Sequence, residues 1–115
     1  MTNTYLDNER LAGLVRRKRG TRGLREISAE IGNISTATLS RVENGSTPDM
    51  ETFIALCDWL QVPPSDLFVT DHQPPQRLDI EEEITILLLG DKRLESDTAY
   101  ALAQIVKATY RYLLE

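Results

Sequence analysis

Apolar residues recur along the chain at intervals of three and four, which is the period of an amphipathic helix. In residues 8–19 this stripe consists of Leu11, Leu14 and Val15. In residues 24–31 it consists of Leu24, Ile27 and Ile31, with Ser28 on the same face. Gly20 follows the first segment and Gly32 the second, in the position where glycine commonly ends a helix. The pattern therefore predicts two short helices with a turn between them.

Two further helices are predicted from their capping residues. Ser35 or Thr36 can cap a third helix that reaches about Glu43, where Asn44-Gly45 ends it. Asp49 can cap a fourth helix, Met50–Leu60, whose wide apolar face comprises Phe53, Ile54, Leu56, Cys57 and Leu60. A short final turn over residues 65–68 follows Pro63-Pro64.

The second part of the chain predicts two more helices. Residues 71–78 contain a Pro-Pro pair, which cannot continue a helix and is typical of a linker. Asp79 begins a helix that runs to Gly90, and Ser96 caps a last helix that ends near Leu114. No segment shows sustained strand alternation, so we expect an all-α protein. Its expected regions are a five-helix domain over residues 1–70, the linker, and a two-helix extension over residues 79–115.

The last helix is apolar over an unusually large part of its circumference, which indicates burial on more than one side. One side can pack on the preceding helix, whereas the other needs the N-terminal domain, a second subunit or a partner protein. We favour a second subunit. The expected interface residues are Leu88, Leu102, Ile105, Val106, Thr109 and Leu113.

The charge is distributed unevenly along the 115 residues, whose formal net charge is -5. A general polyanion-coating role is therefore excluded, although a local basic patch is not. One stretch without acidic residues holds Arg16, Arg17, Lys18, Arg19, Arg22 and Arg25. Cations favour a helix C-terminus, which could account for the first four of them, but less well for the last two.

Enzyme chemistry has almost no support in the sequence. The chain has one histidine, His72 in the linker, and one cysteine, Cys57 on an apolar face. The acidic run Glu81-Glu82-Glu83 stands at a helix start, where carboxylates stabilise the helix, and it has no neighbouring His or Cys. We therefore expect no catalytic residue, no metal and no cofactor. The first residues show no signal peptide and no apolar run is long enough for a membrane span, so we expect a cytoplasmic location.

The order of residues from 24 to 45 resembles the helix-turn-helix of the Cro/phage-repressor family, also called the xenobiotic-response-element (XRE) family. The strongest match is Ser40-Arg41-Val42-Glu43-Asn44-Gly45. Further matches at the family's spacing are Pro48-Asp49-Met50-Glu51-Thr52, Leu60-Gln61-Val62-Pro63 and Asp66-Leu67-Phe68. The resemblance spans residues 8–68 and implies a lambda-repressor-like DNA-binding domain. This chain departs from the family in a turn, Gly32–Ser35, that is one residue longer than usual, and in having Leu24 and Gln61 where Gln and Gly are common.

The resemblance implies that the third helix enters the major groove, where residues near its N-terminus face the base edges. It assigns base contacts to Thr36, Ala37 and Arg41, and Ser40 lies one turn further on. Arg41 could instead form an ion pair with Glu43 or Glu26. Thr36 could be only a cap, and Ala37 only a helix former.

Phosphates should be met by backbone N–H groups at the starts of the second and third helices. The side chains expected to help are Arg17, Arg22, Arg25, Asn44 and Thr47. The sequence thus predicts a transcriptional regulator that binds double-stranded DNA. We expect it to be a dimeric repressor that reads a palindromic operator. The alternative is an antitoxin or interaction module whose apolar C-terminal helices bind another protein.

Overall fold

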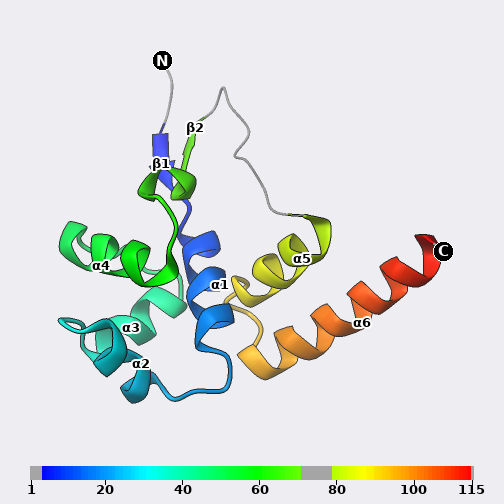
Figure 1. Ribbon diagram of the computed structural model, residues 1–115, viewed down its shortest axis with the longest axis horizontal. Coiled ribbons are helices and arrows are strands. Elements are labelled where there is room, and N and C mark those ends of the chain that lie inside the picture. Colours follow the sequence, from blue (N-terminus) through cyan, green and yellow to red (C-terminus); the bar gives the residue numbers. More distant parts are fainter. Residues whose placement is uncertain (1–3, 71–78, 115) are drawn as a thin grey trace.

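The computed structural model describes residues 4–70 and 79–114, which form helices and one small sheet (Figure 1). The expected linker, residues 71–78, lies outside the described residues. In chain order the elements are β1 (Thr4–Leu6), α1 (Asn8–Arg19), α2 (Leu24–Ile31), α3 (Thr36–Glu43), α4 (Met50–Leu60), the 3₁₀ helix η1 (Pro64–Leu67), β2 (Phe68–Thr70), α5 (Ile80–Leu89) and α6 (Ser96–Leu114).

Four helices begin behind a capping side chain, and the sequence predicts three of these caps. The predicted cap Ser96 is instead the first residue of α6. The side chains of Asp7, Ser35, Asp49 and Asp79 each accept a hydrogen bond from a backbone N–H in the first turn of the helix that follows. Each cap thereby satisfies one of the amide groups that a helix start leaves without an internal partner. The predicted first, second and fourth helices are confirmed to the residue, and the third begins at Thr36 behind the Ser35 cap.

The predicted all-α fold class is confirmed, and one small sheet accompanies the helices. Strands β1 and β2 pair in antiparallel register, with Leu6 opposite Phe68 and Thr4 opposite Thr70. Phe68, which we expected in the final turn, therefore belongs to a strand. Each strand has three residues, too few to show an alternating pattern in the sequence. The pair places the start of the chain beside the end of the helix-turn-helix region.

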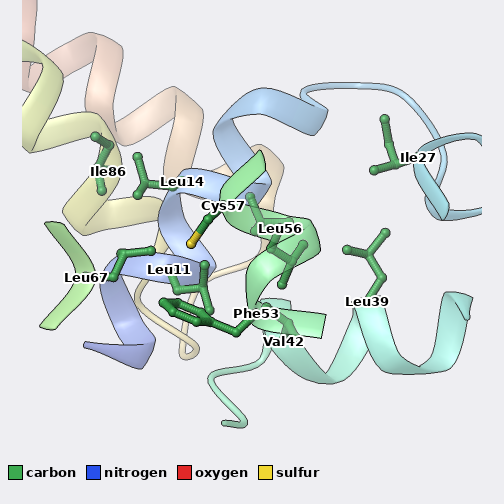
Figure 2. Close-up of a cluster of buried hydrophobic side chains, with 11 residues drawn as sticks. Leu11, Leu14, Ile27, Leu39, Val42, Phe53, Leu56, Cys57, Leu67 and Ile86 are labelled. Atoms are coloured by element: carbon green, nitrogen blue, oxygen red, sulfur yellow. The ribbon is translucent and has the colours of Figure 1, made fainter. Parts of the chain in front are cut away.

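A single core joins the N-terminal helices to α5 (Figure 2). Its buried members come from α1, α2, α3, α4, η1 and α5: Leu11, Leu14, Val15, Ile27, Leu39, Val42, Phe53, Leu56, Cys57, Leu67 and Ile86. Helix α1 lies between α5 and the other helices, so side chains on several of its faces are buried. The region after residue 79 is therefore packed onto the N-terminal helices through α1.

Helices α1 and α5 approach each other closely at two glycines. A Cβ atom on Gly13 would overlap the backbone oxygen of Ile86, and one on Gly90 would overlap the backbone oxygen of Glu9. Only glycine lets the two backbones come so near at these positions. The contact fixes how α5 lies across α1.

Helix α6 runs back along α5 and projects beyond it, so that its C-terminal half stands away from the body of the molecule (Figure 1). Only Ala99 and Ala103 of its described side chains are buried. Its large apolar side chains are exposed, with Ile105 at 63% and Leu113 at 74%. The second apolar side that the sequence indicates is thus not covered by the described part of its own chain. None of the described helices is long and apolar enough to cross a membrane.

We predict that Gly13→Ala lowers the free energy of unfolding by about 1–3 kcal/mol, because the added methyl group forces α1 and α5 apart. Chemical denaturation followed by circular dichroism measures this change. Gly23→Ala is the matched control, since a Cβ there meets no atom within 4 Å. Equal stability of the two variants would contradict the close packing of α1 on α5.

Candidate nucleic-acid interface

The outward face of α3 carries the residues that the family resemblance assigns to base contact. Thr36, Ala37 and Arg41 are exposed, and Ser40 is partly exposed. The opposite face is buried, because Leu39 and Val42 enter the core while Glu43 turns towards α1. Helix α3 therefore presents one polar, acid-free face from its first turn to its last.

A short hydrogen-bond chain orients the arginine on this face. The Ser35 hydroxyl, which caps α3, donates to the Thr38 hydroxyl oxygen at 2.9 Å, and Arg41 Nη2 donates to the same oxygen at 3.0 Å. No ion pair links Arg41 to Glu43 or Glu26 among the described residues, so the ion-pair alternative is not what the structure shows. Thr38 was missed by the sequence analysis, although its position three residues before Arg41 is a usable signal.

The turn between α2 and α3 accommodates its extra residue with left-handed backbone. Gly32 has φ 77° and Asn33 has φ 55°. Asparagine tolerates this region better than most side chains do. Gln61, which stands where the family commonly has glycine, likewise ends α4 at φ 60° and ψ 40°. Both departures from the family pattern are therefore absorbed locally, without a change of fold.

The start of α2 is open for an anion. Its N-cap is Gly23, which offers no side-chain hydrogen bond to the first turn. The amide groups of that turn carry the positive end of the helix dipole, which favours a phosphate. Arg25, in the same turn, is exposed, and its guanidinium forms no ion pair with the residues in the described ranges 4–70 and 79–114.

Most of the basic stretch, in contrast, is held by intramolecular partners. Arg17 pairs with Glu82 of α5 at 2.7 Å, and Arg22 pairs with Glu30 at 2.9 Å. Lys18 donates to the backbone oxygen of Trp59. The structure thus places two predicted phosphate contacts, Arg17 and Arg22, in exposed ion pairs, where the pairs are weak enough to exchange for a phosphate. Their role in DNA binding stays a prediction.

The buried carboxylate of Glu43 anchors the end of α3. Arg19 donates to its two oxygens at 2.6 Å and 2.8 Å, and this bidentate hydrogen bonding raises the pKa of the Arg19 guanidinium. Arg16 Nε lies 3.8 Å from Glu43, while Arg16 Nη1 donates to the backbone oxygens of Leu89 and Leu94. Through these two arginines, α1 ties the helix that faces outward to the connection between α5 and α6.

A second polar cluster ties α2 to α4. The Trp59 indole donates to Glu30 at 2.6 Å, and the Lys18 ammonium lies 4.8 Å from the Trp59 ring centroid. The Trp59 hydrogen bond, followed by the one from Arg22, lowers the pKa of the Glu30 carboxyl. The cluster therefore holds Arg22 near the start of α2 without burying its charge.

The remaining predicted phosphate contacts lie after α3. Asn44 and Thr47 are both exposed. Asn44 donates to the Ser40 backbone oxygen at 3.0 Å, and Thr47 accepts a hydrogen bond from the Asn8 side chain at 2.8 Å. These contacts orient the loop that leaves the outward helix, and they leave the second N–H of the Asn44 side-chain amide and the Thr47 hydroxyl hydrogen available to a phosphate.

No cluster of three or more His, Cys, Asp or Glu side chains suited to a metal ion occurs within residues 4–70 and 79–114. Cys57 is buried in the core, and burial raises the pKa of its thiol. The thiol is therefore held in its unreactive, protonated form.

Comparison with protein families gives one match. A family model described as helix-turn-helix matches residues 15–67, which include all of α2, α3, α4 and η1. The match begins within α1 and ends where β2 starts. No curated protein and no solved structure matches the chain.

We predict that Arg19→Gln lowers the free energy of unfolding by about 2–3 kcal/mol, because it removes the bidentate partner of the buried Glu43 carboxylate. Arg22→Gln removes exposed ion pairs and two long hydrogen bonds to the backbone oxygens of Lys18 and Arg19, and it should cost less than about 1 kcal/mol. Urea denaturation of both variants beside the unchanged protein measures the difference. If the two variants are equally stable, Glu43 does not anchor α3 in this way.

Proposed function

We propose that this protein, whose residues 15–67 match the helix-turn-helix family of DNA-binding transcription regulators, reads a specific DNA sequence with α3 in the major groove. The observation that carries the proposal is the outward face of α3. It carries hydroxyl groups and one arginine and is free of acidic side chains, and the start of α2, the helix before it, has no side-chain cap. A helix with such a face fits the width of the major groove.

The chemistry of the four outward residues suits base edges. Ala37 can contact a thymine methyl group, and Thr36 can do the same or form a hydrogen bond. Arg41 can pair with the O6 and N7 atoms of guanine. Thr38 supports this role, since its hydroxyl already accepts one guanidinium N–H and limits how Arg41 can turn. Ser40 lies beside Arg41 and offers a further hydroxyl.

Phosphate contacts supply the rest of the binding free energy and fix the register on the duplex. We assign them to the amide groups at the starts of α2 and α3, to Arg25, and to Asn44 and Thr47. Arg17 and Arg22 would have to exchange an ion pair within the protein for a phosphate, so their net contribution should be smaller than that of Arg25. The modest number of free cations implies moderate affinity.

A dimer that binds a two-fold symmetric operator completes the proposal. A single helix-turn-helix reads only a few base pairs, whereas two copies related by a two-fold axis read half-sites ~34–36 Å apart. Such a dimer would repress transcription by occupying DNA that another protein needs. We place this activity in the cytoplasm, together with the DNA it reads.

One observation favours a second candidate function. The exposed apolar side chains of α6 could bind a different protein, as they would in an antitoxin or an interaction module. The oligomeric state of the purified protein distinguishes the two functions. A regulator that reads a palindrome is a homodimer, whereas an interaction module is a monomer that needs a co-expressed partner protein.

We predict that Arg41→Ala relaxes the preference at one base pair in each half-site by about 1–3 kcal/mol, because the bidentate contact to guanine is lost. Selection of random duplexes at a stated near-physiological salt concentration, followed by sequencing, measures the preference. Arg93→Ala is the matched control, since Arg93 is also exposed and pairs only with Asp91 in its own loop. Unchanged selectivity of Arg41→Ala would remove this residue from base readout.

We also predict that Arg25→Gln reduces the slope of log affinity against log salt by about 0.9, the value for one neutralised phosphate. Arg17→Gln should change the slope less, because Glu82 already neutralises Arg17. Titrations of one duplex at several salt concentrations give both slopes. A larger effect at Arg17 would show that its ion pair opens on DNA.

A further inference from the structure

Exposed apolar side chains occur on α5 as well as on α6. On α5, Leu87 is 60% exposed and Ile80 is 51% exposed, and Ile84 between them is partly exposed. These three residues follow the i, i+4, i+7 spacing of one helix stripe. The sequence analysis expected Leu88 on the interface, but Leu88 is half-buried and lies one position, or about 100°, from Leu87.

Contacts with Arg17 of α1 show which side of each helix faces the body of the protein. Glu82 of α5 pairs with the Arg17 guanidinium at 2.7 Å, and the Tyr100 hydroxyl of α6 donates to the Arg17 backbone oxygen at 2.9 Å. Both helices therefore turn these positions towards α1. At ~100° per residue, positions 80, 84 and 87 lie roughly 140–160° around α5 from Glu82.

The same calculation places the exposed stripe of α6. Leu102, Val106, Thr109 and Leu113 lie roughly 120–180° around the helix from Tyr100. Both stripes therefore point away from Arg17, although Leu87 borders Glu9 and Arg10 at the start of α1. The two helices lie next to each other (Figure 1). Together they form one continuous surface, here called the α5–α6 face, which comprises Ile80, Ile84, Leu87, Leu102, Val106, Thr109 and Leu113, with Ile105 and Tyr112 along its outer edge.

None of the side chains of this face carries a charge. Its one polar group away from the edge, the Thr109 hydroxyl, donates to the Ile105 backbone oxygen at 2.9 Å. Beside the face, Arg111 pairs with Glu81, and Arg10 of α1 pairs with Glu83. Glu9 and Arg93 border the face at Leu87. The face can thus be desolvated without stranding an unpaired charge.

We propose that a second copy of this chain covers the α5–α6 face, so that α5 and α6 of the two protomers form a four-helix bundle. This inference rests on the proposed function, which requires a two-fold dimer. The face presents roughly 400–500 Å² of exposed apolar side-chain surface. A standard interface takes ~800 Å² from each partner, of which about three fifths is apolar, so the area is what one dimer needs.

Two features favour a bundle over a simple pair of α6 helices. A two-stranded coiled coil needs only one narrow seam, whereas the stripe on α6 includes both Leu102-Val106-Thr109-Leu113 and the neighbouring Ile105 and Tyr112. A stripe of this width packs against two helices. The second feature is the apolar stripe on α5, which would remain exposed to solvent if only the two α6 helices packed together.

The test compares one glutamate substitution on each helix with a matched control. Leu87→Glu changes α5 and Leu113→Glu changes α6, and both side chains are already mostly exposed, so the protomer should fold. Met50→Glu on α4 is the control, because Met50 is 67% exposed and lies outside the face. Sedimentation equilibrium measures the oligomeric state, and circular dichroism confirms that each variant is helical.

We expect the unchanged protein and Met50→Glu to be dimers at micromolar concentration. Leu87→Glu and Leu113→Glu should each raise the dimer dissociation constant by at least ~100-fold, because every substitution enters a two-fold interface twice. If Leu113→Glu dissociates the dimer but Leu87→Glu does not, the interface is confined to α6 and the bundle is wrong. If the unchanged protein is a monomer at tens of micromolar, a second copy does not cover this face.

A separate measurement, DNA selection by the monomeric variants, tests the dimer interface independently of DNA reading. The monomeric variants should still select the sequence of one half-site, with affinity for the full palindrome reduced by about a hundredfold or more. A dimer that selects no sequence would refute the proposed function and leave the bundle standing. If a protein that never dimerises selects a half-site, sequence-specific DNA reading stands and the bundle is refuted.

Discussion

The buried carboxylate of Glu43 is the constraint on which the arrangement of the helices depends. It stands at the last turn of α3 and is almost fully buried, where a charge is costly unless cationic partners accompany it. Arg19 supplies them directly, and Arg16 lies within 4 Å while it also binds the carbonyl groups at the end of α5 and before α6. One helix, α1, therefore sets the position of both the outward helix and the C-terminal pair.

This use of cations changes how the basic stretch of α1 is interpreted. A row of arginines and one lysine before a helix-turn-helix suggests a patch for DNA, yet most of these side chains hold other parts of the protein in place. Arg10 and Arg17 bind the acidic first turn of α5, which the sequence explains only as favourable helix-end charge. Under the proposed function, binding to DNA would rely on helix starts and a few free side chains, which suits the proposed dimer.

The sequence was enough to name the residues of the candidate site, but not the residues that hold its helix in place. Thr36, Ala37 and Arg41 could be named from the resemblance to a known family, and Ser40 from its place one turn further along the same helix. The groups that hold this helix are distant in sequence: Arg19 is 24 residues from Glu43. The β1–β2 pair was missed for a related reason, because two segments of three residues become strands only when they meet.

The sequence by itself determined where the helices begin and end, because caps, glycines and the three-four spacing act within a few residues. It also determined that the last helix has more apolar surface than one neighbour can cover. The tertiary structure decided which charges remain free and which apolar residues remain exposed. Both depend on partners far along the chain, as with Arg16 and Leu89, which lie 73 residues apart. Ion pairing and burial are properties of assembled helices, and no single segment contains them.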